Sequence, residues 1–329
     1  MVVMMGGLHI EMNLLKLLGD WLSGSGWITA LVQANITSSG KAESMLTGSH
    51  VTRTRYAHQV TAGGLKILCD NAYQKYLENY SEEGNPLTFD EWSVNQCKNE
   101  PQFKFWMTTL NLELMVLQFI RSIRERNFQM YIQSLLKVIP WLFAFDHVNY
   151  ARWLSVHISD MVNLQTTHPE VYCEFLKGHF AVHKTSNIFS AMAIDQCHEQ
   201  LNDLIKGDGG AIGLTENPQA LERWMTAGPE FCRAIQEFQN SFQTSRSSST
   251  RHHDQNRSTQ REYMKDVVSF VTTLEDMGNP YMEDSGDLLT IDTKVIKSKE
   301  TVQTLFKIEA EGVKQFSKFV NERITAEQN

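Results

Sequence analysis

The longest regular pattern in this sequence is an apolar repeat of three and four residues within residues 103–134. The repeat is carried by Trp106, Leu110, Leu114, Leu117 and Ile120. This spacing places apolar side chains on one face of an α-helix, so the segment is predicted to form a long amphipathic helix. A cluster of arginines, Arg121, Arg124 and Arg126, marks a candidate break in this pattern and is interpreted as a solvated face. Patterns of the same period occur at 10–21, 50–77, 262–277 and 302–324. Helices with such apolar faces pack against one another, so these patterns predict a mainly α, bundle-like fold.

Two segments are predicted to be strands instead. The sequence from His179 to Ser190 alternates around a Thr-Ser-Asn turn, which is typical of a short β-hairpin. Val2 to Met5 is apolar and ends at Gly6-Gly7, which indicates a buried strand. A lone strand needs neighbours to pair with. We therefore expect an orphan N-terminal strand that belongs to the sheet of a larger domain.

The predicted domain boundaries follow a change of composition. Residues 1–242 are predicted to form the main helical domain, as the C-terminal part of a larger domain. Residues 243–262 are rich in serine and poor in core residues, so they are predicted to be a polar linker or loop. Residues 263–329 contain two helical patterns and form the predicted C-terminal helical segment.

Composition excludes several classes of protein. The five cysteines are scattered without a CxxC pair, which argues against a disulfide framework or a zinc finger and favours a reducing, intracellular compartment. No apolar run approaches the ~20 residues that a membrane span requires, so no membrane association is expected. The net charge is −8. A nucleic-acid binder with this charge needs a local basic patch.

Chemically versatile side chains cluster at 194–205. With 3.6 residues per turn, Asp195, His198, Glu199 and Asn202 fall on one side of a helix. Apolar residues occupy much of the other side. Carboxylates, an imidazole and an amide together suit a divalent-metal site or an acid/base site, and they equally suit a solvated helix face. The glycines that follow fit no nucleotide-binding loop.

A second polar group follows Pro140, where the helical pattern is predicted to break. Asp146 is flanked by aromatic residues, so we expect it to be partly buried and to have a partner in Arg152 or His147. Asn149 lies beside them on the predicted helix. The group is interpreted as a structural polar network or as support for a functional site.

Several of these segments together resemble a group of animal proteins that derive from transposable elements, a group without an established activity. The segments are GGLHIEM, PWLFAFDHVNYARWLSVHISDM, HPEVYCEFLKGHFAVHKT, IDQCHEQLND and KGDGGAIGLTENP. The resemblance extends from Val2 to about Asp292, and the group it points to is abundant in cnidarians, molluscs and fish. Within it, GGLHIEM also resembles the segment of RNase H-like transposases in which a strand ends and a helix begins. His9 matches the histidine of that segment, and Gly6 stands where such enzymes often have Cys or Asp.

This second resemblance implies a site. RNase H-like transposases often continue with a long helical insertion and take their last acidic metal ligand from a later helix. Glu199 matches that acid, with Asp195, His198 and Asn202 as orienting groups and Mg²⁺ or Mn²⁺ as the metal of the complete enzyme. Phosphate contacts are expected from three arginines, Arg53, Arg55 and Arg124. A two-metal site also needs carboxylates on the other side of the metal pair, which the resemblance places on earlier strands that this chain lacks.

Two hypotheses follow. In the first, the chain is part of an RNase H-like, transposase-derived protein that acts on DNA in the nucleus. It would then be inactive alone and would need an N-terminal portion or an oligomer partner. In the second, it is a non-catalytic intracellular interaction protein with no cofactor, and its polar clusters are structural.

Overall fold

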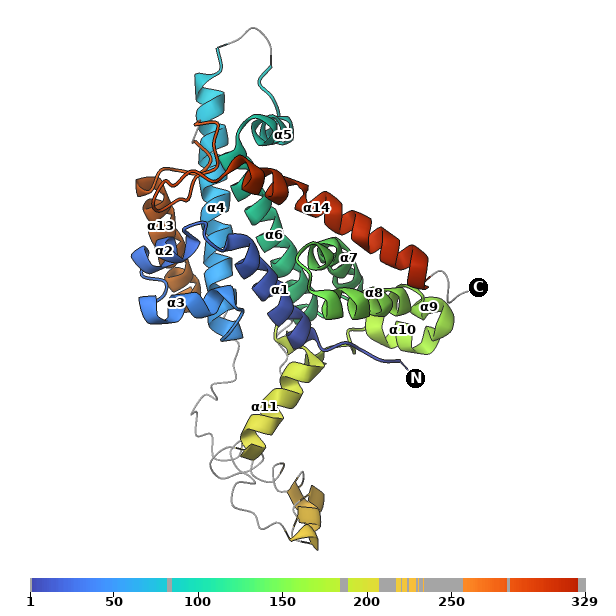
Figure 1. Cartoon of the computed structure of the whole chain (residues 1–329). Helices are drawn as coiled ribbons and strands as arrows, with labels where there is room; N and C mark the ends of the chain where they lie inside the picture. Colours follow the sequence, from blue (N-terminus) through green and yellow to red (C-terminus); the bar gives the residue numbers. More distant parts are fainter. Residues whose placement is uncertain are drawn as a thin grey trace.

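The computed structural model describes residues 2–81, 85–183, 189–206, 217–219, 221–223, 225–228, 230, 233, 257–282 and 285–324. The first half of the chain is a succession of helices (Figure 1). They are α1 (Gly7–Leu22), α2 (Trp27–Gln33), α3 (Ser39–Leu46), α4 (Val51–Asn79), α5 (Phe89–Asn99), α6 (Pro101–Arg124), α7 (Phe128–Ala144), α8 (Val148–Val162), α9 (Leu164–Thr167) and α10 (Pro169–Leu176).

The second half contains the two described strands and further helices. They are β1 (Val182–His183), β2 (Ala191–Met192), α11 (Ile194–Lys206), α13 (Arg257–Asp276), α14 (Lys299–Phe319) and a terminal π-helical turn, η1 (Val320–Ile324). The predicted mainly α fold with one short hairpin is therefore confirmed. The two strands pair antiparallel, with Val182 opposite Met192 and His183 opposite Ala191, within the two alternating segments HFAVHK and NIFSAMA. Their connection, 184–188, lies outside the described residues.

Helix α6 runs through the centre of the molecule and packs against α1, α4 and α7. Trp106 and Leu110 are buried there as the apolar repeat predicts, whereas Leu114 is exposed. The helical pattern over 103–134 forms two helices, α6 and α7, which separate at the arginine cluster where the candidate break lies. The chain turns at Arg126, which has a positive φ of 56°, and the Asn127 side chain then accepts a hydrogen bond from the Met130 amide to begin α7.

The predicted break at Pro140 is wrong, because α7 continues through it to Ala144. Buried side chains on both sides of the proline, such as Val138 and Leu142, pack into the core. This packing stabilises a continuous helix by more than the proline destabilises it through its missing N–H and the clash of its ring. The outer surface of Pro140 receives α14. A Cβ on Gly312 would lie 2.1 Å from the Pro140 carbonyl oxygen, so this helix crossing requires a glycine.

The expected N-terminal strand is not formed. Residues 2–6 have no regular secondary structure. Within the described part of the chain, the only sheet is the two-stranded hairpin β1-β2, and residues 2–6 pair with neither strand. Val2, Met4 and Met5 instead rest against the edge of the helical core, while Val3 is largely exposed.

The C-terminal segment joins the same core. Helix α13 packs against α4 and α2, and α14 lies across α7 (Figure 1). Helix α13 begins at Arg257, within the range predicted to be a linker, and residues 243–256 lie outside the described part of the chain. Among the described residues, no helix is long and apolar enough to cross a membrane.

Candidate functional site

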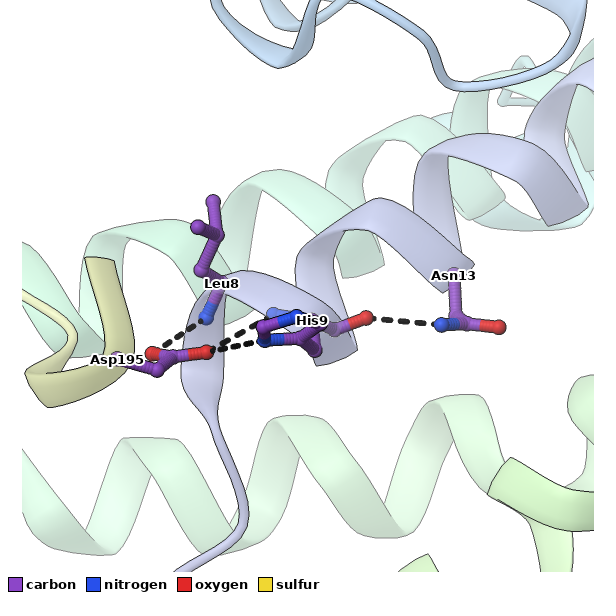
Figure 2. Close-up of polar contacts among 4 residues, drawn as sticks. All are labelled: Leu8, His9, Asn13 and Asp195. Carbon is purple, nitrogen blue, oxygen red and sulfur yellow. Dashed lines mark hydrogen bonds and ion pairs between the residues drawn. The ribbon is translucent and has the colours of Figure 1, made fainter. Parts of the chain in front are cut away.

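One carboxylate links two distant segments, the start of α11 and the start of α1. The Asp195 carboxylate accepts hydrogen bonds from the backbone amides of Leu8, at 3.0 Å, and His9, at 3.1 Å (Figure 2). It also bonds the Nδ1 of His9 at 2.9 Å. The first amides of a helix have no partner within the helix, and Gly6 at the N-cap has no side chain to offer. Asp195 therefore caps α1 from 187 residues away.

This contact changes the ionisation of Asp195. Burial alone would raise the pKa of the carboxyl, but hydrogen bonds from Leu8 and His9 outweigh it and hold the pKa below its usual value. The carboxylate is thus a fixed negative charge at the positive end of α1.

The glycine pair before His9 permits this close approach. A Cβ on Gly6 would lie 2.3 Å from Oδ2 of Asp195, and one on Gly7 would lie 2.9 Å from the Cβ of Ala193. Any larger residue at these two positions would push α11 away from α1. The GGLH segment therefore has a structural reason for its glycines, which the sequence pattern alone did not reveal.

The His9 ring is oriented by Asp195 and half exposed. It borders a pocket of about 340 Å³ together with Met5, Gly6, Asn149, Tyr150 and Trp153. A carboxylate that fixes one ring nitrogen leaves the other directed and available as an acceptor or ligand. The structure thus brings His9 next to Asp195 and places Asn149 at the rim of the same pocket.

The remaining predicted residues of α11 lie on its outer part. His198 is exposed and borders a cavity of about 320 Å³ that Asp195 and Tyr131 also line. Asn202 is half-buried. Glu199 is exposed, and within the described part of the chain no hydrogen bond or ion pair involves its carboxylate. Its predicted role as a metal ligand stays a prediction.

Beneath this cavity lies a buried pair that sequence reasoning missed. The Tyr131 hydroxyl and Nε2 of His157 are 2.9 Å apart, and both side chains are almost fully buried. Burial lowers the pKa of His157 to about 4. Burial also raises the pKa of Tyr131, and the charge of Asp195 adds to that effect. The pair is neutral at pH 7.

No assembled metal site is present among the described residues, because they contain no group of three or more His, Cys, Asp or Glu side chains placed to hold an ion. Glu199 could supply one ligand. Asp195 already uses both oxygens to bond α1. Mg²⁺ and Mn²⁺ prefer several oxygen ligands, so a metal here would need carboxylates from another segment.

The expected burial of Asp146 is wrong. Asp146 has a positive φ of 56° in the turn between α7 and α8, and its side chain is exposed. Asp is one of the few residues that tolerate this conformation. Its expected partner His147 instead bonds Asp20 of α1, with Nε2 3.1 Å from Oδ2. Arg152, the other candidate, is exposed on α8.

The three arginines expected to contact phosphates occupy different environments. Arg53 is exposed. Arg55 is buried, and its guanidinium donates two hydrogen bonds to Glu11, at 2.5 and 2.8 Å, so its charge is already neutralised. Arg124 is buried and lies over the ring of Phe189. Of the three, only Arg53 presents an open guanidinium, and its phosphate contact stays a prediction.

A further buried ion-pairing group was not predicted. His58 Nδ1 and a carboxylate oxygen of Glu113 are 2.8 Å apart in the core, with Trp27 stacked on the imidazole. Burial raises the pKa of Glu113, and the neighbouring His58 opposes that rise. The pair joins α4 to α6. The one sequence signal for it is a glutamate inside an otherwise apolar helical pattern.

Comparison with known proteins gives one family. Residues 84–328 match the model of a domain of unknown function, DUF8702. The match includes α11, the predicted linker and the C-terminal helices. No curated protein and no solved structure matches the chain.

Proposed function

Because the chain belongs to the DUF8702 family, a domain of unknown function, we propose a role from its own geometry. The chain forms the helical part of an RNase H-like, transposase-derived protein that acts on DNA. In that protein Glu199 supplies one carboxylate to a Mg²⁺ or Mn²⁺ site. The other ligands come from a segment or partner that completes the site.

One observation carries this proposal. The GGLH segment and the acidic helix α11 are 187 residues apart in sequence, yet Asp195 joins them directly. Between them lie helices α1 to α10 and the hairpin. This is the order of parts that the resemblance to RNase H-like transposases implies: a helix start with histidine, a long helical insertion and a returning acidic helix.

The position of Glu199 supports the same role. It follows Asp195 by four residues, which places it about one turn, or ~6 Å, further along the same face of α11. Its carboxylate is exposed and bears no hydrogen bond within the described residues. An acid without a structural partner is free to bind a cation. In two-metal phosphoryl transfer, such an acid holds one side of the metal pair.

The opposite face of α11 supports the need for a further segment. Ile194 and Leu201 are about half exposed, and the helix extends away from the helical body (Figure 1). An amphipathic helix usually packs its apolar face against another element. A sheet-bearing segment or an oligomer partner would cover these side chains and bring the missing carboxylates beside Glu199.

The alternative is a non-catalytic helical interaction protein, and one observation favours it. Asp195 is fully accounted for as the cap of α1, so one of the two α11 carboxylates has a structural task. In this alternative, Glu199 is a solvated surface residue and the apolar face of α11 binds a partner without any metal.

A metal titration separates the two functions. Thermal melts are recorded for the wild type, for Glu199→Gln and for Glu309→Gln across a series of Mn²⁺ concentrations. Glu309 is an exposed glutamate on α14 and serves as the matched control. Without metal, Glu199→Gln should leave stability unchanged, since it removes no hydrogen bond.

With Mn²⁺, the wild type and the control should gain the same thermal stability and Glu199→Gln should gain less. Ligand at ten times its dissociation constant stabilises a fold by about 1.4 kcal/mol. We expect a dissociation constant in the millimolar range, of order 10⁻³ M, because most ligands are missing. Equal responses from all three proteins would move the conclusion to the interaction protein.

A further inference from the structure

A groove lies between α8 and the C-terminal end of α14, which are neighbours in Figure 1. Its volume is about 870 Å³. Six of the residues that line it are Phe143, Arg152, Trp153, Lys318, Phe319 and Arg323. Aromatic and basic side chains thus share one concave surface.

Trp153 is the most unusual of these residues. Its side chain is 68% exposed, although a tryptophan in a folded protein is normally well buried. The indole also borders the pocket beside His9 on its other side. Trp153 therefore stands between the groove and the start of α1, where α11 is attached, and offers a flat apolar surface to a ligand.

The charges of the groove favour an anion. Arg152 and Arg323 form no ion pair or hydrogen bond within the described residues. Among the residues that the structure describes, Lys318 makes a single long contact, 3.9 Å, to Glu322. The three cations outnumber the two carboxylates of the groove, Asp146 and Glu322, although the whole chain has a net charge of −8. The groove thus has an excess of one positive charge on an acidic protein, which is the sign of charge that nucleic-acid binding by such a chain requires.

We propose that this groove binds a single-stranded segment of nucleic acid, with one base stacked on Trp153 and phosphates bound by Arg152 and Arg323. Guanidinium groups bind phosphate oxygens in pairs, and exposed aromatic rings stack on unpaired bases. An acidic peptide would satisfy the arginines without using the indole. In a duplex the bases are paired and stacked inside the double helix, so none of them can stack on the indole of Trp153. The inference rests on the proposed action on DNA and names the form of DNA that the helical part binds.

Fluorescence anisotropy tests it directly. A labelled 15-nucleotide single strand of mixed sequence is titrated with the full chain in EDTA, at several salt concentrations. The variants are Trp153→Ala, Trp153→Phe and the double variant Arg152→Gln/Arg323→Gln. The control is Lys41→Gln/Lys98→Gln, which removes the same charge from exposed lysines on α3 and α5. Thermal melts confirm that every variant is folded.

Trp153→Ala should weaken binding about tenfold, as loss of one stacked base does, and Trp153→Phe should retain most of the affinity. The arginine variant should reduce the slope of log K against log salt by roughly 1.4, or 0.7 for each lost phosphate contact. The control should keep the wild-type slope and its affinity should fall less than that of the arginine variant.

Three results would overturn the proposal: no binding by the wild type, equal binding by Trp153→Ala, or equal displacement of the strand by a duplex or a polyglutamate peptide. Because the assay contains EDTA, it does not depend on a metal at Glu199. A failure here would therefore leave the Mn²⁺ titration to decide the proposed metal site separately.

Discussion

Oδ2 of Asp195 accepts hydrogen bonds from both the backbone amide and the ring Nδ1 of His9, at 3.1 and 2.9 Å. Oδ1 accepts from the amide of Leu8. One carboxylate therefore satisfies the open amides of α1, orients a histidine and fixes the position of α11. Stability and site geometry depend on the same side chain.

Replacing Asp195 should weaken the fold. Asp195→Ala removes the cap and leaves two helix amides without a partner, so the free energy of unfolding should fall by about 1–2 kcal/mol. Urea denaturation at pH 7 measures it. Asp203→Asn, at an exposed position on the same helix, is the matched control and should change little. An Asp195→Ala protein as stable as the control would show that the cap contributes nothing.

The same cap predicts a dependence on pH. Its hydrogen bonds lower the pKa of Asp195 in the fold, so the stabilisation is complete above the unfolded value, about 3.9, and is lost as the pH falls through the folded pKa. Between pH 5 and 2, Asp195→Asn should lose less stability than the wild type. Parallel pH profiles would contradict this.

The burial of His157 predicts a second, independent dependence of stability on pH. Its pKa is about 4 in the fold and about 6.5 when unfolded, so below pH 6.5 the unfolded chain takes up a proton that the folded chain does not. The free energy of unfolding should therefore decrease as the pH falls from 6.5 to 4, by at most about 1.4 kcal/mol per pH unit.

Two histidine variants isolate this effect. His157→Gln should be less stable at pH 7 but should show a flatter profile between pH 6.5 and 4. His168→Gln, at an exposed position, should keep the wild-type slope. Denaturation curves at five or more pH values measure both. If His157→Gln keeps the full slope, another group is responsible.

The backbone conformation of Asp146 predicts that two substitutions at this position differ in their effect on stability. Because its φ is positive and its side chain exposed, Asp146→Gly should be neutral or slightly stabilising, whereas Asp146→Ala should cost about 0.5–1 kcal/mol. Thermal or urea denaturation measures both. A buried, paired carboxylate would instead make both substitutions cost about 1–3 kcal/mol.

Local patterns predicted the helices well, because apolar spacing and helix packing agree over most of the chain. The same patterns did not predict helix ends or breaks at positions where tertiary packing determines them. The helical pattern over 103–134 extends past the turn at Arg126, so the arginine cluster marks a candidate break but the apolar spacing does not fix the residue at which α6 ends. Pro140 is a strong local breaker, yet packing on both sides keeps α7 intact.

The candidate site could be predicted only in part. Asp195 and Glu199 are on one helix, so their spacing of four residues predicts that they lie on the same face. Nothing local relates Asp195 to His9, because a separation of 186 residues is closed only by the packed helices between them. The buried partner of His157 was missed for the same reason, since Tyr131 belongs to another helix.

Amide hydrogen exchange at Leu8 and His9 tests the central claim, that Asp195 holds α11 on the start of α1. These two amides lie in the first helical turn and have no other hydrogen-bond partner in the described structure. We predict slow exchange at both in the wild type and near-unstructured rates in Asp195→Ala, while Leu14 and Leu15, deeper in α1, stay protected in both proteins. Fast exchange at Leu8 and His9 in the wild type, or unchanged protection in the variant, would contradict the account.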